Sequence, residues 1–308
     1  MIKIFLGLTP FIFITFLGFM FGRYKILDLD KAKILNLFLF YIAVPALIIN
    51  FIAQIEIGQI DLKQIISYLF MQIICGSFTF YVVTKFFKKT ITESIIWSLT
   101  VALSNHVTLL LPITKIYFKD DVIVQVGSII LMDCIILLSI ITFFLELATK
   151  KNIKLLIFIR NVIFNPLILS ILIGLFLFVL DINIKDTPIE YTLDKLAACV
   201  SPVGLFAIGI ILSFYTNEVI NKLTISITIL KLIISPIVLL FISYIIFNLG
   251  LPKEIPGAFF VSVAPCGVTS IVLCSAYNVS PENIIKAIFI STFVSIVTIF
   301  FAIQYLTA

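Results

Sequence analysis

Charged residues are scarce in this chain of 308 residues. Asp, Glu, Lys and Arg together make up 12% of it, whereas hydrophobic residues make up 62%. A soluble domain usually has about 25% charged residues. The deficit excludes a soluble globular protein and predicts an all-α integral membrane protein with lipid as a partner. The net charge of +5 comes from short loops and gives no indication of nucleic-acid binding.

Residues that bind metals or perform covalent catalysis are also scarce. The chain has one histidine, His106, and five cysteines without CxxC or CxxH spacing, so we expect no metal site, no disulfide framework and no cofactor. The apolar segments lack Ser–His or Glu–His spacing and paired acids, which argues against an enzyme. A channel is disfavoured because no pore-helix motif is present. A ligand sensor would need an output domain, for which the apolar segments leave no room.

Long apolar segments, in contrast, are abundant. Ten of them run for about 20 residues, long enough at roughly 1.5 Å per residue to cross a hydrocarbon core about 30 Å thick. They cover residues 2–21, 34–53, 64–84, 95–118, 122–148, 167–180, 193–215, 223–247, 255–277 and 284–306. We therefore predict ten transmembrane helices, the first retained because no signal-peptide cleavage site follows it.

Basic residues in the connecting loops predict the orientation. Thirteen Lys and Arg fall on one side of the ten-span arrangement and seven on the other. The richer side is expected to face the cytoplasm, which puts both termini outside the bacterial cytoplasmic (inner) membrane. Residues 149–166 are basic and amphipathic, which favours a linker along the cytoplasmic surface; a basic stop-transfer flank is the alternative.

Polar residues and prolines interrupt the fourth and ninth segments near their middles. They are Asn105, His106, Thr108 and Pro112 in the fourth segment, and Pro265, Gly267 and Thr269 in the ninth. Proline removes a backbone donor and clashes with the preceding turn, and lipid cannot satisfy the polar groups. We therefore predict two broken helices. Such breaks in corresponding places of two halves are typical of a secondary transporter's binding site.

The placement of proline also indicates two similar halves. Pro45 interrupts the second segment of the first half, and Pro202 interrupts the second segment of the later half. Five segments per half is an odd number, so the second half inserts upside down relative to the first. We predict residues 1–148 as the first five-helix repeat, 149–166 as the linker and 167–308 as the second repeat.

The two breaks are expected to cross near the bilayer midplane. Asn105 lies about 15 Å from the cytoplasmic end of its segment, and Pro265 about 13 Å from the outer end of its own. A helix that restarts there directs unpaired N–H groups and the positive end of its dipole at the crossing, which favours an anion. The predicted substrate-binding residues are Asn105, His106, Thr108, Pro112, Pro265, Gly267 and Thr269, with Asn50 and Ser201 from the second and seventh segments. The alternatives are hydrogen bonds between helices and tolerated proline kinks.

Asp133 is the one acid well inside a segment. Its carboxyl is expected about 16 Å from the outer end of its helix, where it must be neutral or paired. Asp133 is therefore the predicted site of proton or sodium coupling, supported by Gln72 and Gln125; a neutral carboxyl bonded to a neighbouring helix is the alternative. His106 has no visible partner, although the ordinary pKa of about 6.5 for histidine suits proton coupling. Lys231 is expected to extend along its own stem to the cytoplasmic interface.

Short sequences spread over nearly the whole chain carry a resemblance. They lie at residues 41–45, 105–112, 165–166, 201–209, 230–236, 264–277 and 291–295. Together they are similar to the auxin efflux carrier family, whose bacterial members include carriers of malonate and malate. The resemblance implies a ten-helix inverted repeat with a scaffold part, a mobile transport part and two crossed broken helices that bind an organic anion. Related chains usually have glycine between the Asn and the Pro of the fourth segment, which this chain lacks.

These observations predict a secondary-active or potential-driven transporter of mono- or dicarboxylates that works by alternating access. The alternative is a sodium- or proton-coupled symporter or antiporter of the bile-acid-symporter or sodium/proton-exchanger type. An exchanger usually has paired acids at the crossing, and the two broken segments contain none. The substrate, the direction of transport, the coupling ion and the oligomeric state stay open, with a homodimer among the alternatives.

Overall fold

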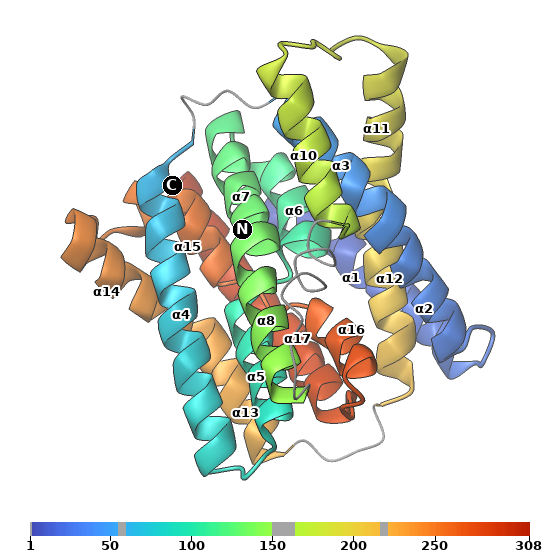
Figure 1. The fold of residues 1–308 in the computed structure, drawn as a ribbon, viewed down its shortest axis with the longest axis vertical. Helices are drawn as coiled ribbons and strands as arrows, with labels where there is room; N and C mark the ends of the chain where they lie inside the picture. Colours follow the sequence, from blue (N-terminus) through green and yellow to red (C-terminus); the bar gives the residue numbers. More distant parts are fainter. Residues whose placement is uncertain (1, 55–59, 150–163, 216–220) are drawn as a thin grey trace.

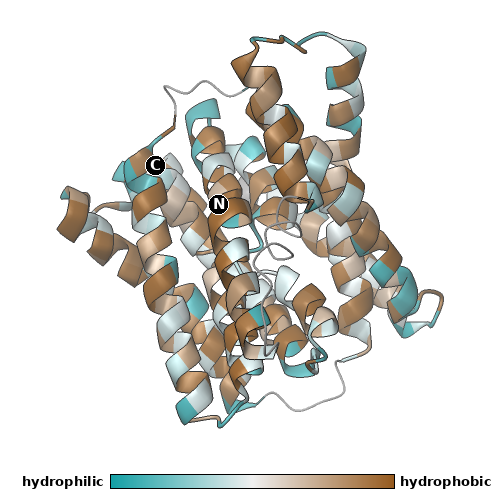
Figure 2. Cartoon of the chain, in the orientation of Figure 1, coloured by the Kyte–Doolittle hydropathy of each residue, from teal (hydrophilic) through white to brown (hydrophobic). Residues whose placement is uncertain are grey.

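The molecule is built from helices laid side by side (Figure 1). The computed structural model describes residues 2–54, 60–149, 164–215 and 221–308, and all regular elements in these ranges are helical. Apolar residues run along the helices, and hydrophilic residues gather toward their ends (Figure 2). Many large apolar side chains face outward, including Phe78, Phe241 and Phe301 at 51%, 62% and 61% exposure. A surface of this kind requires lipid, as expected for an integral membrane protein.

The first five predicted segments are all helical. The elements are α1 (Ile2–Arg23), α2 (Leu29–Phe38), η1 (Leu39–Ala43), α3 (Val44–Ala53), α4 (Leu62–Lys85), α5 (Ile91–Ala102), η3 (His106–Leu110), α6 (Leu111–Tyr117), α7 (Asp120–Met132), η4 (Asp133–Leu137) and α8 (Leu138–Thr149). Polar N-caps begin several of them, because a side-chain oxygen satisfies N–H groups of the first turn. Asp28 caps α2, Asp61 caps α4, and Thr90 forms a capping box with Glu93 on α5.

The last five predicted segments are helical as well. The elements are α10 (Pro166–Val179), α11 (Pro188–Ala198), α12 (Val200–Ser213), α13 (Lys222–Ile229), η5 (Leu230–Ile234), α14 (Ser235–Phe247), η6 (Pro252–Glu254), α15 (Pro256–Ser262), α16 (Thr269–Ala276) and α17 (Glu282–Thr307). Most of the linker predicted at 149–166 lies outside the described residues.

Within the described residues, seven helical stretches are long and apolar enough to cross a membrane. They are Leu6–Arg23, Leu29–Ala53, Leu62–Lys85, Asp120–Thr149, Pro188–Ser213, Lys222–Phe247 and Glu282–Thr307. The predicted segments without such a stretch are the two broken ones and the sixth, where α10 has 14 residues. The described helices therefore confirm the predicted fold class, an all-α membrane protein.

In the described ranges, four π-helical turns lie within the helices, and three of them precede a proline. Pro45 follows η1, Pro112 follows η3 and Pro236 follows η5, each at the second residue of the next α-helix. Proline cannot donate to the carbonyl four residues back and clashes with it, and a widened turn relieves the clash. Pro45 therefore does not interrupt its helix as predicted, whereas the seventh segment turns at Cys199, before Pro202.

Two helix pairs make the most extensive contacts between the halves of the chain. Helix α1 packs along α12, and α10 packs along α3. Gly18 and Gly209 allow the first pair to approach backbone to backbone, because a Cβ at either position would lie 2.1 Å from a carbonyl oxygen of the other helix. The first helix of each half thus packs against the second segment of the other half.

Candidate functional site

The two broken segments cross and are joined by backbone hydrogen bonds. Helix α5 ends at Ala102 and η3 begins at His106, while α15 ends at Ser262 and α16 begins at Thr269. The linkers pair as an antiparallel β-bridge, in which Gly267 N donates to Leu103 O at 2.8 Å and Asn105 N donates to Pro265 O at 2.9 Å. Gly267 is required by this approach, since a Cβ there would lie 3.0 Å from Leu103 O.

Asn105 occupies the position just before the restarted helix. Thr108 Oγ1 donates to Asn105 Oδ1, which fixes the amide. Asn105 is 4% exposed, and its Nδ2 has no hydrogen-bond partner among the described residues. Buried amide donors are normally hydrogen-bonded, so this N–H group is suited to donate to an oxygen of a ligand.

Two helix N-termini meet at this crossing. The continuous run of η3 and α6 starts at His106, and α16 starts at Thr269, which is half-buried. The first turn of a helix has N–H groups without intrahelical acceptors and a partial positive charge. The crossing can therefore stabilise an anion without a charged side chain in contact with it.

His106 has a partner that the sequence did not indicate. Its Nε2 lies 2.7 Å from Asp133 Oδ2 on η4, and both residues are buried. Gln72 on α4 donates from Nε2 to Asp133 Oδ1 at 2.6 Å and to Ala102 O at 3.1 Å. The expectation of a lone histidine is therefore wrong. The expected depth of the two residues was the available signal for the pairing, because the sequence predicts both near the midplane, approached from opposite ends of their helices.

Lys231 does not extend to the cytoplasmic interface. Its side chain is fully buried, and Nζ donates to Val101 O at 2.9 Å and to Ser104 Oγ at 2.7 Å. Val101 lies in the last turn of α5, whose free carbonyl groups carry the negative end of the helix dipole. The carbonyl groups at this C-terminus attract the ammonium group toward the crossing. The lysine stem is long enough to extend toward the interface or toward the crossing, so the sequence alone does not decide its direction.

A polar cavity of about 660 Å³ is lined by α3, by η3 with α6, by α7, and by α11 with α12. Asn50, Pro112 and Ser201, three predicted binding residues, all line it. Asn50 Nδ2 donates to Asp194 Oδ1 at 2.5 Å. The sequence reasoning missed Lys115, which also lines the cavity. Its position three residues after Pro112, on the same half-helix, was the available signal.

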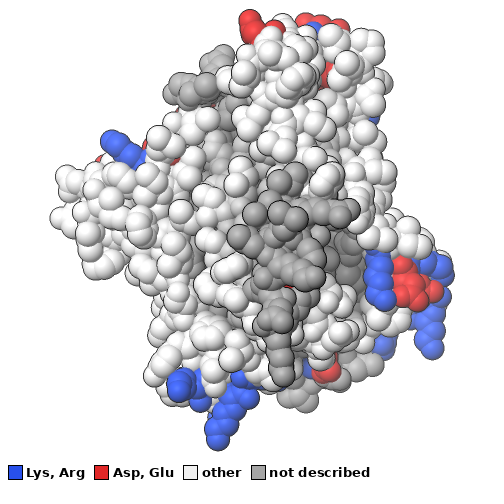
Figure 3. All heavy atoms as spheres, viewed as in Figure 1, with Lys and Arg blue, Asp and Glu red and all other residues white. Residues whose placement is uncertain are grey.

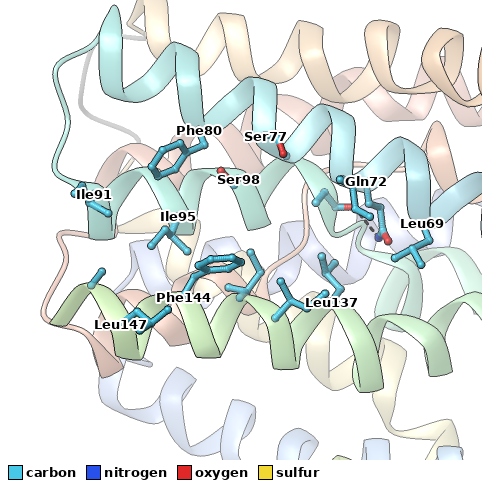
Figure 4. A pocket seen from close by; sticks show the side chains of 16 residues that line it. Leu69, Gln72, Ser77, Phe80, Ile91, Ile95, Ser98, Leu137, Phe144 and Leu147 are labelled. Atoms are coloured by element: carbon cyan, nitrogen blue, oxygen red, sulfur yellow. Dashed lines mark hydrogen bonds between the residues drawn. The ribbon is translucent and has the colours of Figure 1, made fainter. Parts of the chain in front are cut away.

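A second cavity lies between α4, α5 and α8 and measures about 750 Å³ (Figure 4). Figure 4 shows apolar side chains such as Phe80, Ile95 and Phe144 along it, with Gln72 at one end. None of the described residues that line it is charged. The charged residues that line a cavity are therefore found in the smaller, polar one.

Gln125 is not one of the residues that the described structure hydrogen-bonds to Asp133. Its Oε1 accepts from Gly257 N at 3.1 Å, and Gln64 Oε1 accepts from Ala258 N at 3.0 Å. Both amides therefore satisfy N–H groups in the first turn of α15, which begins at Pro256 and has no side-chain cap of its own. The structure gives Gln125 a contact that shapes the ninth segment.

Charged residues gather at the two ends of the molecule. Figure 3 shows Lys and Arg at the lower end, near the connection between α4 and α5, and both basic and acidic residues near the connection between α1 and α2. Asp and Glu gather at the upper end, near the connection between α10 and α11. The apolar faces between these ends are almost free of charge in this view.

Apolar helices around a buried crossing of two broken helices define a membrane transporter. The sequence matches the family of membrane transport proteins over residues 3–303, and the chain belongs to this family, which includes the auxin efflux carriers. It is a family of transporters and not of enzymes. The expected resemblance is thereby confirmed. None of the curated proteins matches the chain.

Proposed function

We propose that the protein is a secondary transporter of small mono- or dicarboxylates that works by alternating access. The observation that carries the proposal is the buried Nδ2 of Asn105, which has no partner among the described residues and lies where two helix N-termini meet. A carboxylate suits this environment, because it accepts hydrogen bonds from N–H donors and is stabilised by both helix dipoles. Thr108 orients the amide, His106 and Thr269 begin the two helices, and Pro265 and Gly267 hold the crossing open.

The proposed architecture has ten spans in two inverted five-helix repeats. The reciprocal packing of α1 on α12 and α10 on α3 supports it, as do the breaks in the fourth segment of each half. We infer that residues 1–148 and 167–308 are the repeats, and that 149–166 link them on the cytoplasmic side. The segregation of Lys and Arg supports an inner-membrane protein with both termini outside.

The proposed substrate path runs through the polar cavity. Asn50 and Ser201 come from the α3 and α12 side, whereas Pro112 and Lys115 come from the broken fourth segment. A path between these two groups of helices suits alternating access, in which one group moves against the other. Lys115 lines the cavity together with Asp120 and Asp194, so the cavity offers a cation beside two carboxylates.

The proposed coupling site is Asp133 with Gln72. The hydrogen-bonded pair of His106 and Asp133 favours coupling to a proton over sodium, since a histidine donor takes a position that a cation would need. A proton-coupled symporter is thus the second candidate. Gln125 has a helix-capping contact instead. We also propose a homodimer, which none of the contacts described above requires.

Uptake into proteoliposomes tests the proposal. Labelled acetate, pyruvate, malonate and malate are supplied with proton or sodium gradients imposed separately. Asn105→Ala should weaken binding of the transported acid by roughly ten- to a hundredfold, the value of a lost hydrogen bond to a charged ligand of about 1.5–3 kcal/mol. Asn36→Ala on α2 is the matched control and should bind like the parent. Binding in Asn105→Ala within twofold of the parent would remove the crossing as the site.

A further inference from the structure

We propose that His106 and Asp133 form a proton-gated hydrogen-bond donor: the pair takes up one proton with each substrate carboxylate and offers it the Nδ1–H of His106. The inference rests on the proposed function, because it concerns the same crossing. It differs from proton binding by Asp133 alone, because His106 touches the substrate and Asp133 acts as the positioning residue.

The geometry divides the four polar atoms of the pair into separate roles. Gln72 donates to Asp133 Oδ1, which leaves Oδ2 as the oxygen that shares a proton with His106 Nε2, 2.7 Å away. His106 is 4% exposed and Asp133 is fully buried. His106 Nδ1 has no partner within the part of the chain that the structure describes. One nitrogen is therefore paired, and the other is available.

Proton counting then fixes what Nδ1 can do. A neutral imidazole has one N–H. Opposite an ionised carboxylate at this distance the hydrogen must lie on Nε2, because two facing lone pairs repel. Nδ1 is then a bare lone pair that repels a substrate carboxylate. After uptake of one proton, the pair is either imidazolium with carboxylate or imidazole with carboxylic acid, and both arrangements place a hydrogen on Nδ1.

The two residues that carry these unpartnered nitrogens follow one another in the sequence, and a carboxylate has two oxygens. His106 follows Asn105 directly at the start of η3, and Asn105 Nδ2 is the other buried polar atom of the crossing without a partner among the described residues. The amide and the protonated imidazole can each donate to one oxygen. Proton and anion therefore enter together, and both leave on the opposite side when the pair releases them.

Other titratable groups surround the pair. They are Lys231 on η5, Tyr68 and Cys75 on α4, Cys134 on η4, and Cys266 at the crossing. The ordinary pKa values of Tyr, Cys and Lys are about 8.5 or higher, whereas histidine ordinarily changes charge between pH 5 and 8. Lys231 is the group that the test must separate from the pair.

The test is calorimetric binding of pyruvate and of malonate to the full-length protein between pH 5 and 9. Buffers of different ionisation enthalpy count the protons taken up. The wild type should take up about one proton per ligand, and its affinity should therefore fall as the pH rises, by up to about tenfold per pH unit. His106→Gln should bind without proton uptake, because its amide does not titrate.

Asp133→Asn gives the sharper expectation. The new amide donates to His106 Nε2, so the ring hydrogen moves to Nδ1 at every pH. Binding should become independent of pH and, at pH 8.5, at least tenfold tighter than in the wild type. A merely structural role for Asp133 would instead weaken binding at all pH values.

Two results would overturn the proposal. One is ligand binding by the wild type without proton uptake. The other is a pH dependence that persists in His106→Gln and disappears in Lys231→Gln. If the wild type binds none of acetate, pyruvate, malonate or malate, the carboxylate assignment itself fails, which is a different result from binding that does not respond to pH.

Discussion

At the scale of single residues, the hydroxyl of Ser104 joins three parts of the molecule. Its Oγ donates to Val261 O at 2.8 Å and accepts from Lys231 Nζ at 2.7 Å. Tyr68 OH lies 3.0 Å away and must donate, because the one hydroxyl hydrogen of Ser104 is used. All hydrogen-bonding capacity of this side chain is therefore occupied beside the crossing.

Ser104→Ala should therefore lower the free energy of unfolding by about 2–4 kcal/mol, because buried groups on three elements each lose a partner. Thermal unfolding of the purified protein in one detergent measures the effect. Ser94→Ala is the matched control: Ser94 is buried on α5, the helix that ends just before Ser104, and its Oγ has no partner among the described residues. Its unfolding midpoint should stay near that of the parent. Equal losses in both variants would contradict the role given to Ser104.

At the scale of elements, three of the π turns each contain a buried ionisable residue. His106 is on η3, Asp133 on η4 and Lys231 on η5. A following proline accounts for η3 and η5, but none follows η4. The widened turn of η4 instead coincides with the contacts of Asp133, in agreement with the frequent occurrence of π turns at functional positions.

The packing of α1 on α12 leads to a second prediction. Gly18→Ala should destabilise the protein by about 1–3 kcal/mol or more, because the new methyl would lie 2.1 Å from Phe206 O, a backbone atom that cannot move without separating the helices. Gly76→Ala on α4 is the control, since its nearest neighbour would be 3.8 Å away. It should be neutral or gain up to about 1 kcal/mol from helix propensity. The unfolding midpoints of both variants check this, and a tolerated Gly18→Ala would count against close packing.

At the scale of the whole molecule, the halves interlock through their outer helices. Because α1 packs on α12 and α10 packs on α3, neither half can move without the first two helical segments of the other. These segments form one group, and the broken segments with α4, α7, α8, α13, α14 and α17 form the other. The proposed transport cycle is a movement between these two groups, with the polar cavity at their boundary.

Cysteine labelling tests the proposed topology. Single cysteines at Thr149, which ends α8, and at Ala308 should react with an impermeant reagent from opposite sides, Thr149 from the cytoplasm. The five native cysteines are replaced first, because Cys199 is partly exposed. Labelling of both positions from one side would exclude five spans in each half.

The helices were predictable from the sequence, whereas the contacts between them were not. Hydropathy and proline placement depend on the order of residues along the chain, and they were enough to predict helices in the described residues and the breaks near Asn105 and Pro265. The pairing of His106 with Asp133 depends on the rotation of two helices about their axes, which hydropathy does not report. The direction of Lys231 likewise depends on carbonyl groups freed by a break in another segment.

The β-bridge between Ser104 and Cys266 has a consequence for how specificity can diverge. The hydrogen bonds of the bridge join backbone atoms of Leu103, Asn105, Pro265 and Gly267. The neighbouring side chains therefore contribute little to its geometry. Exchanges at positions 106–108 can therefore alter what is recognised while the crossing itself persists. Selection for a new cargo in the laboratory thus has these few positions available without loss of the framework.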